Sequence, residues 1–135
     1  MPALQRGQIV ICDRFSDSTF AYQGYGRDVN MQWLRKANDV ASGGLSPDFT
    51  LLFDLPASIG LARRRKARGK QNRLDRESER FHRKVRRGFL ALARQFPRRI
   101  TVIDARQQPD DIAIATQALV FKRLSRYRLL RNRKS

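Results

Sequence analysis

Side chains suited to binding a small phosphorylated ligand gather in residues 13–24, which read DRFSDSTFAYQG. The residues with useful binding groups are Asp13, Arg14, Ser18, Thr19, Tyr22 and Gln23. The planar guanidinium of Arg14 can grip a phosphate with two parallel hydrogen bonds. The amide of Gln23 can pair with a pyrimidine edge, and the ring of Tyr22 can pack on a sugar or base. Together these groups suit a nucleoside monophosphate.

Each of these residues also has an ordinary structural explanation. Arg14 could form a surface ion pair with Asp17. Tyr22 could be half buried, and Gln23 could open a turn together with Gly24. Residue types alone leave both interpretations open.

A second candidate feature is the basic segment 63–76. Its candidate arginines are Arg63, Arg64, Arg65, Arg68 and Arg73. Phosphoryl transfer depends on positioning and on cations that neutralise the charge of the transferred group, and arginines can supply such cations. The alternative is a solvated basic helix, on which Arg63, Arg64 and Arg65 would point in three directions.

Three short apolar runs each end at an aspartate. The runs and their carboxylates are 8–12 with Asp13, 49–53 with Asp54, and 100–103 with Asp104. Such runs predict buried strands of a parallel sheet. Ligands of open α/β sheets bind beyond the C-terminal strand ends, so the three aspartates are expected along one functional edge. Aspartate also simply terminates strands, and for Asp54 we favour that explanation.

Helical patterns separate these runs, which makes the expected architecture an α/β alternation. Helices are predicted over 30–42, after Pro56, over 75–96, and from Pro109 onward. The first has apolar residues at Met31, Leu34, Ala37 and Val40, and the third has a continuous stripe at Phe81, Val85, Phe89, Leu92 and Phe96. We interpret that stripe as core packing, and we also interpret Trp33 and Tyr127 as packing residues and His82 as structural or solvent-facing.

Composition limits the class of protein. The chain has 135 residues and a formal net charge of +17, which fits one domain that attracts polyanions. Its single cysteine, Cys12, excludes an internal disulfide and is predicted to be a small buried side chain. Because no stretch approaches the roughly 20 apolar residues of a membrane span, we expect a cytoplasmic protein without membrane contact. Basic residues also fill 122–135, which we expect to be a loosely organised tail after a domain at 1–121.

Several segments in order resemble the thymidylate kinase family, bacterial type. DRFSDSTFAYQGYGR resembles the signature after that family's third strand, and GGLSPDFTLLFDLPASIGLARRRKARG its fourth strand and the start of its lid. NRLDRE resembles the lid exit, and TVIDARQQPDDI the adenine-side loop after the fifth strand. The resemblance runs from Pro2 to about Ala118. It implies a three-layer parallel sheet of the P-loop nucleoside monophosphate kinase type and the reaction of ATP with dTMP to give ADP and dTDP.

The resemblance also implies roles for individual residues. Arg14 would hold the dTMP phosphate, Asp13 would help order Mg²⁺, and Tyr22 would lie against the deoxyribose. The residues facing the thymine would be Ser18, Thr19 and Gln23. The catalytic residues would be Arg14 and the lid arginines, with Arg63, Arg68 and Arg73 as candidates. The residues on the ATP side would be Asp104, Ala105 and Arg106.

The sequence departs from the family in one respect. The family begins with a strand and a GxxxxGK(S/T) loop that cradles the ATP phosphates, and these 135 residues contain neither that motif nor the family's first two strands. We therefore expect an incomplete sheet, Met1 as an internal methionine or the start of a truncated gene, and little or no turnover by the chain alone. A second chain could supply the strands, and a homodimer is common in the family. The rival hypothesis is a non-catalytic basic module that binds nucleic acid.

Overall fold

The computed structural model describes residues 2–66 and 77–132, with side chains through residue 127. The elements in chain order are α1 (Pro2–Gln5), α2 (Ser16–Thr19), η1 (Phe20–Gly26), α3 (Met31–Ser42), β1 (Thr50–Asp54), α4 (Ala57–Lys66), α5 (Glu79–Gln95), β2 (Ile100–Asp104) and α6 (Pro109–Asn132). After α3 the order is a strand, two helices, a strand and a helix, which agrees with the predicted α/β class.

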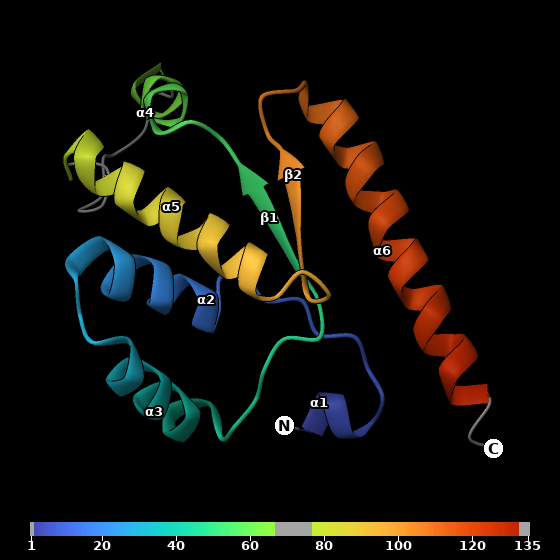
Figure 1. Ribbon diagram of the computed structural model, residues 1–135. Helices are drawn as coiled ribbons and strands as arrows, with labels where there is room; N and C mark the ends of the chain where they lie inside the picture. Colours follow the sequence, from blue (N-terminus) through green and yellow to red (C-terminus); the bar gives the residue numbers. More distant parts are fainter. Residues whose placement is uncertain (1, 67–76, 133–135) are drawn as a thin grey trace.

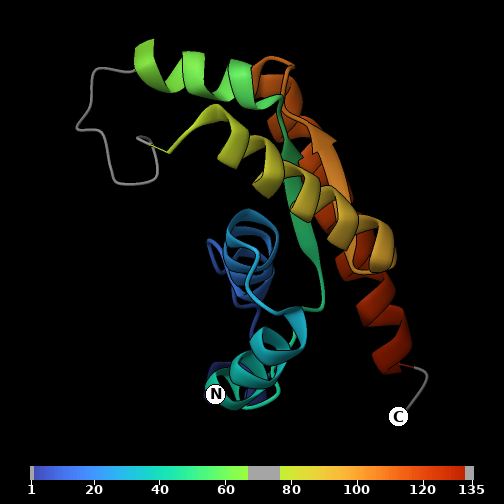
Figure 2. The same ribbon diagram turned by 60° about the vertical axis from the view of Figure 1, so that its left-hand side comes forward.

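β1 and β2 form a two-stranded parallel sheet. Their register runs from Thr50 opposite Ile100 to Asp54 opposite Asp104. Helix α5 lies on one side of this sheet and α6 on the other, as the two views in Figure 1 and Figure 2 show. The aspartates that end the two strands are therefore neighbours, as the sequence predicted.

The prediction of a buried strand over residues 8–12 is wrong. This segment has no regular structure, and Ile11 is 94% exposed. Isolated strands are not stable because their backbone groups need hydrogen-bonded neighbours. Within the described residues, β1 and β2 pair only with each other, and no strand lies against 8–12. Cys12 is consequently exposed rather than buried, and Asp13 does not join the strand-end edge.

The core forms where α5 packs on η1 and on the sheet. The predicted α5 stripe is confirmed, since Phe81, Val85 and Leu92 are all buried, and Ala21 of η1 is fully inaccessible. The helix begins later than predicted, because the Ser78 side chain accepts a hydrogen bond from the Phe81 backbone N–H and so caps its N-terminus.

Glycine is required where α5 meets η1. A Cβ atom added at Gly88 would lie 2.7 Å from the Tyr25 side chain, and one at Gly26 would lie 2.8 Å from the Phe81 ring. Any larger residue at these two positions would separate the helices. Close packing of α5 and η1 therefore depends on both glycines.

Helix α3 begins one residue later than predicted and buries only the first half of its predicted stripe: Leu34 is buried and Met31 partly buried. Asn30 caps its start, and Gly43, with a φ of 62°, ends it in the left-handed conformation. Three-residue steps fall about 60° short of a full turn each, so the predicted apolar stripe drifts around the helix. Val40 is accordingly 86% exposed, and Trp33, expected to pack, is 63% exposed.

Helix α6 continues through most of the segment expected to be a loose tail. It runs to Asn132, so that expectation is wrong for residues 122–132. Arg123 ties this part of the helix to the start of β1: it donates to the Asp48 carbonyl at 2.9 Å and stacks on the Phe49 and Tyr127 rings.

His82 of α5 is partly buried against the edge of Phe81, with ring centroids 5.7 Å apart.

The core assignment predicts unequal effects of one substitution at two valines. Val85→Ala should lower the free energy of unfolding by about 1.5–3 kcal/mol, because it removes two buried carbon atoms and leaves a cavity. Val40→Ala should change it by less than about 0.5 kcal/mol, because Val40 is already exposed. Urea unfolding followed by circular dichroism measures both, and equal losses would contradict the assignment of the core.

Candidate functional site

Residues 13–27 form a bend followed by a continuous helical segment. The chain bends at Asp13 and Arg14, and α2 then passes directly into η1. η1 is a π-helix, a wider helix that is uncommon and occurs frequently at functional sites. The residue pattern of this segment did not predict a π-helix. The nearest signal is Gly24, which packs against α3: an added Cβ would lie 2.5 Å from the terminal carbon of Met31 and would displace that side chain.

Arg14 and Tyr22 are brought together at the start of this segment. Arg14 has a φ of 68°, an uncommon left-handed conformation for a non-glycine residue. Its guanidinium lies 5.1 Å from the centroid of the Tyr22 ring and donates through Nη2 to Tyr22 Oη at 3.3 Å. The alternative of an ion pair with Asp17 is wrong, because Asp17 binds Arg99 instead.

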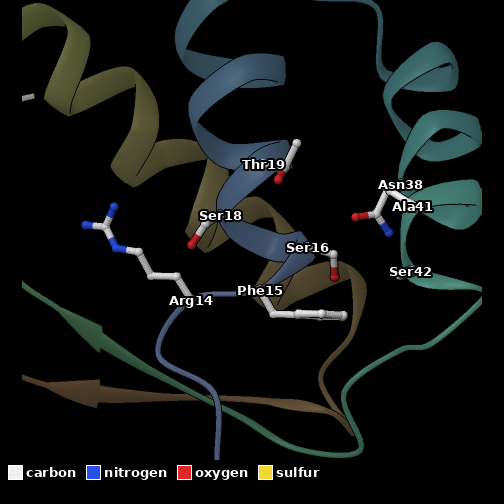
Figure 3. Close-up of a pocket in the computed structure, with 8 residues that line it drawn as sticks. All are labelled: Arg14, Phe15, Ser16, Ser18, Thr19, Asn38, Ala41 and Ser42. Carbon is white, nitrogen blue, oxygen red and sulfur yellow. The ribbon is translucent and has the colours of Figure 1, made fainter. Parts of the chain in front are cut away.

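Three of the predicted ligand-binding residues, Arg14, Ser18 and Thr19, contribute to the lining of one pocket at α2. A pocket of about 400 Å³ lies between α2 and α3. Its lining residues are Arg14, Phe15, Ser16, Ser18, Thr19, Asn38, Ala41 and Ser42. In Figure 3, Asn38 points from α3 toward α2, whereas the side chains of Arg14 and Ser18 extend from the opposite side of α2. Asn38 and Ser42 were not predicted; they lie four residues apart on the face that α3 buries.

A second charged cluster lies at the C-terminal ends of the strands. Arg86 of α5 donates to both carboxylate oxygens of Asp54, at 2.7 and 2.8 Å. Arg106 holds Asp104 in the same bidentate way, with Nη2 to Oδ2 at 2.7 Å. A pocket of about 340 Å³ is lined by these four residues with Pro56 and Val102. Arg86 was assigned no role from the sequence. The available signal was that Asp54 ends a predicted strand and that the predicted helix over 75–96 carries many basic residues that could pair with it.

The ion pairs perturb proton affinities in this cluster. Hydrogen bonds from the Arg106 side chain and backbone lower the pKa of Asp104 to about 2. The hydrogen bond to Asp54 raises the pKa of Arg86, and the hydrogen bond to Asp104 raises that of Arg106. Asp104 therefore remains ionised and paired with Arg106 throughout the neutral pH range.

Arg63 of α4 contacts the loop that follows β2. Its Nη1 donates to the Ala105 carbonyl at 2.9 Å, and its Nη2 donates to the Arg106 carbonyl at 3.3 Å. The structure thus gathers Arg63 with Asp104, Ala105 and Arg106, which the sequence had assigned to separate roles. Arg68 and Arg73 lie outside the described residues.

The remaining predicted residues are exposed or only partly buried. Asp13, Thr19 and Gln23 are exposed, and Ser18 is partly buried. Among the described residues, no group of three or more His, Cys, Asp or Glu side chains is placed to hold a metal ion. Mg²⁺ is commonly bound through one or two carboxylates together with substrate phosphates, and the exposed Asp13 beside Arg14 fits that kind of shared site. None of the described helices is both long and apolar enough to cross a membrane.

Comparison with known proteins shows the family to which this chain belongs. A family model for thymidylate kinase matches residues 1–114, a range that contains both clusters, α4 and α5. The chain belongs to the thymidylate kinase family. The family assignment made from the sequence is therefore confirmed.

Individual thymidylate kinases are similar over most of the chain. The enzyme of Desulfovibrio desulfuricans is 49% identical, with 88% of this chain and 58% of the relative aligned. That of Thermomicrobium roseum is 48% identical over 94% of this chain and 60% of the relative. That of Geobacillus thermodenitrificans is 46% identical over 92% and 56%. The chain thus spans less than two thirds of the length of these relatives.

The strand-end cluster predicts a pKa change that can be observed directly. Arg106→Ala should raise the pKa of Asp104 from about 2 toward its ordinary value of 3.8, because the main donor to the carboxylate is lost. The stability contributed by this lowered pKa is present above about pH 4 and is lost as the pH falls toward 2. Carboxyl-carbon NMR titration measures the shift. Arg83→Ala, which removes an exposed partner of Glu79, is the matched control and should leave Asp104 unchanged.

Proposed function

We propose that this chain contributes the dTMP-binding part of a thymidylate kinase, which transfers the terminal phosphoryl group of ATP to dTMP. The observation that carries the proposal is the stacking of Arg14 on Tyr22, next to a pocket that Arg14 and Ser18 both line. One guanidinium Nη2 donates to Tyr22, and the other N–H groups of Arg14 can donate to the dTMP phosphate. The family relationship supplies the substrate class.

In this proposal, residues 18–23 recognise the nucleoside. Tyr22 packs against the deoxyribose, where its bulk disfavours a 2′-hydroxyl. Gln23 is exposed on η1, so its amide is accessible to the thymine edge, and Ser18 and Thr19 add hydroxyl groups. Asp13 helps to hold Mg²⁺ at the phosphate end; the ion would neutralise phosphate charge during transfer.

The strand-end cluster serves the ATP side. Arg63 fixes the loop at Ala105 and Arg106 by donating to both carbonyls, and so orders the backbone that would face the adenine. Because the Arg63 guanidinium already donates to these two carbonyls, Arg63 is a weaker candidate for binding the transferred phosphoryl group than its place in the basic segment 63–76 implied. The catalytic roles of Arg68 and Arg73 stay predictions.

Turnover requires a phosphate-binding loop that these 135 residues do not contain. We propose that the loop and its strand come from other residues, on the same polypeptide or on a second chain. The outer edge of β1 is open within the described part of the chain, and an added parallel strand would satisfy its backbone groups. The 135 residues alone should therefore bind dTMP without appreciable ADP release.

Arg14 provides the direct test of the dTMP site. Arg14→Ala should weaken dTMP binding by about 1.5–3 kcal/mol, the usual cost of losing a hydrogen bond to a charged group. Binding of thymidine, which lacks the phosphate, should change little. Isothermal titration calorimetry measures both ligands, and Arg83→Ala serves as the control for removing one positive charge. Unchanged dTMP affinity would remove Arg14 from its proposed role.

Salt dependence separates dTMP recognition from the rival nucleic-acid hypothesis. Recognition by Gln23 should discriminate dTMP from dCMP, and the discrimination should persist as salt rises, because it depends on directional hydrogen bonds. A polyelectrolyte contact through the basic residues would instead weaken steeply with salt. Affinities for dTMP, dCMP and a DNA oligonucleotide at about 50 and 200 mM salt decide between them. Steep salt dependence without nucleotide discrimination would favour the nucleic-acid module.

A further inference from the structure

A buried ion pair connects the dTMP-binding segment to the beginning of the sheet. Arg99 donates from Nη1 and Nη2 to the two carboxylate oxygens of Asp17, at 2.7 Å each. The Asp17 side chain is 9% exposed and that of Arg99 20%. Thr50 completes the unit, since its hydroxyl donates to Asp17 at 3.3 Å and accepts from Arg99 at 3.0 Å.

The energetics of this unit favour a geometric role. Removing two charges from water costs several kcal/mol per ion, so a buried pair rarely adds much net stability over apolar packing. Its bidentate geometry nevertheless fixes the direction and distance of the two side chains. The guanidinium of Arg99 is also held from one side by the Phe96 ring, 5.0 Å away. Asp17 is therefore held at a defined place relative to β1 and β2.

The N-terminal turn of the helical segment needs such an external support. Helix α2 is that first turn, and its N-cap residue, Phe15, makes no side-chain capping bond. The first backbone N–H groups of a helix have no partner within it, so an uncapped end is held in place only by contacts with other parts of the structure. Asp17 lies three residues after Arg14 and directly before Ser18, so its anchor sets where both residues point.

Arg99 also belongs to the first rung of the sheet. Its backbone carbonyl accepts a hydrogen bond from the Thr50 N–H at 2.9 Å, while its side chain holds Asp17. One residue thus joins the strand pairing to the helix that presents Arg14. By contrast, η1 is anchored separately by α5, through Ala21 and the close approach at Gly26.

We propose that Asp17, Arg99 and Thr50 form a positioning unit that aims Arg14 at the dTMP phosphate without touching the ligand. The inference rests on the proposed dTMP site and adds residues to which no binding role was assigned. Because η1 is held independently, loss of the unit impairs phosphate binding and leaves recognition of the nucleoside by Tyr22 and Gln23 largely intact.

The test is a double-mutant cycle between Asp17 and Arg14. Asp17→Asn should weaken dTMP binding at least tenfold, and Arg99→Lys should do so by a similar factor, while thymidine affinity changes less than about twofold. In an Arg14→Ala background, Asp17→Asn should change dTMP affinity less than twofold, because the residue through which it acts is gone. Asp39→Asn and Arg94→Lys alter exposed residues and are the matched controls.

A measurement without ligand tests the positioning unit independently of the proposed dTMP binding. Nuclear Overhauser contacts between the Arg14 side chain and the Tyr22 ring should be present in the parent and Asp39→Asn proteins and absent in Asp17→Asn. Urea unfolding of each variant shows whether it is folded; should Asp17→Asn fail to fold, Arg99→Lys carries the same measurements. If the parent protein binds no dTMP, the proposed function fails, while the Overhauser contacts still test the unit. Persistence of these contacts in Asp17→Asn and Arg99→Lys, or equal loss of dTMP and thymidine affinity, would overturn the inference.

Discussion

Close packing of η1 on α5 is the contact on which most of this structure depends. Gly26 and Gly88 allow the two helices to approach at a distance that no larger residue would permit. The approach buries Phe81 and Val85 against the π-helix and fixes the Tyr22 side of the segment to which we assign dTMP binding. The same α5 helix crosses the sheet and delivers an arginine to the carboxylate that ends β1. A single helix therefore supports both the Arg14–Tyr22 cluster and the strand-end cluster.

The sequence predicts the elements that are stabilised by local pattern. β1, β2 and the buried stripe of α5 follow from apolar spacing, and the family follows from four ordered segments. Features that depend on distant partners were not predictable. Residues 8–12 look like a strand but lack a neighbour to pair with, and Asp17 finds a cation 82 residues away rather than the nearby Arg14. The π-helix packs against α3 and α5, and the apolar spacing within its own residues does not indicate these contacts.

The large positive charge is used in part for construction. Arg63, Arg86, Arg99 and Arg123 each bind a carboxylate or backbone carbonyl that lies more than 30 positions away in the chain, at 2.7–2.9 Å. Two of them, Arg99 and Arg123, also stack on aromatic rings. A guanidinium can do both because it is planar, weakly hydrated and rich in donors. Net charge alone thus overstates how much of the positive surface is available to polyanions.

The left-handed backbone at Arg14 sets selection for stability against selection for ligand binding at one residue. Non-glycine residues pay roughly 1–2 kcal/mol for this conformation, whereas glycine adopts it freely. Selection for thermostability alone would therefore favour Arg14→Gly, and the same change would remove the guanidinium that we assign to the phosphate. A library screened only for folding should drift toward glycine at this position, so retention of arginine there would report selection for ligand binding rather than for a stable fold.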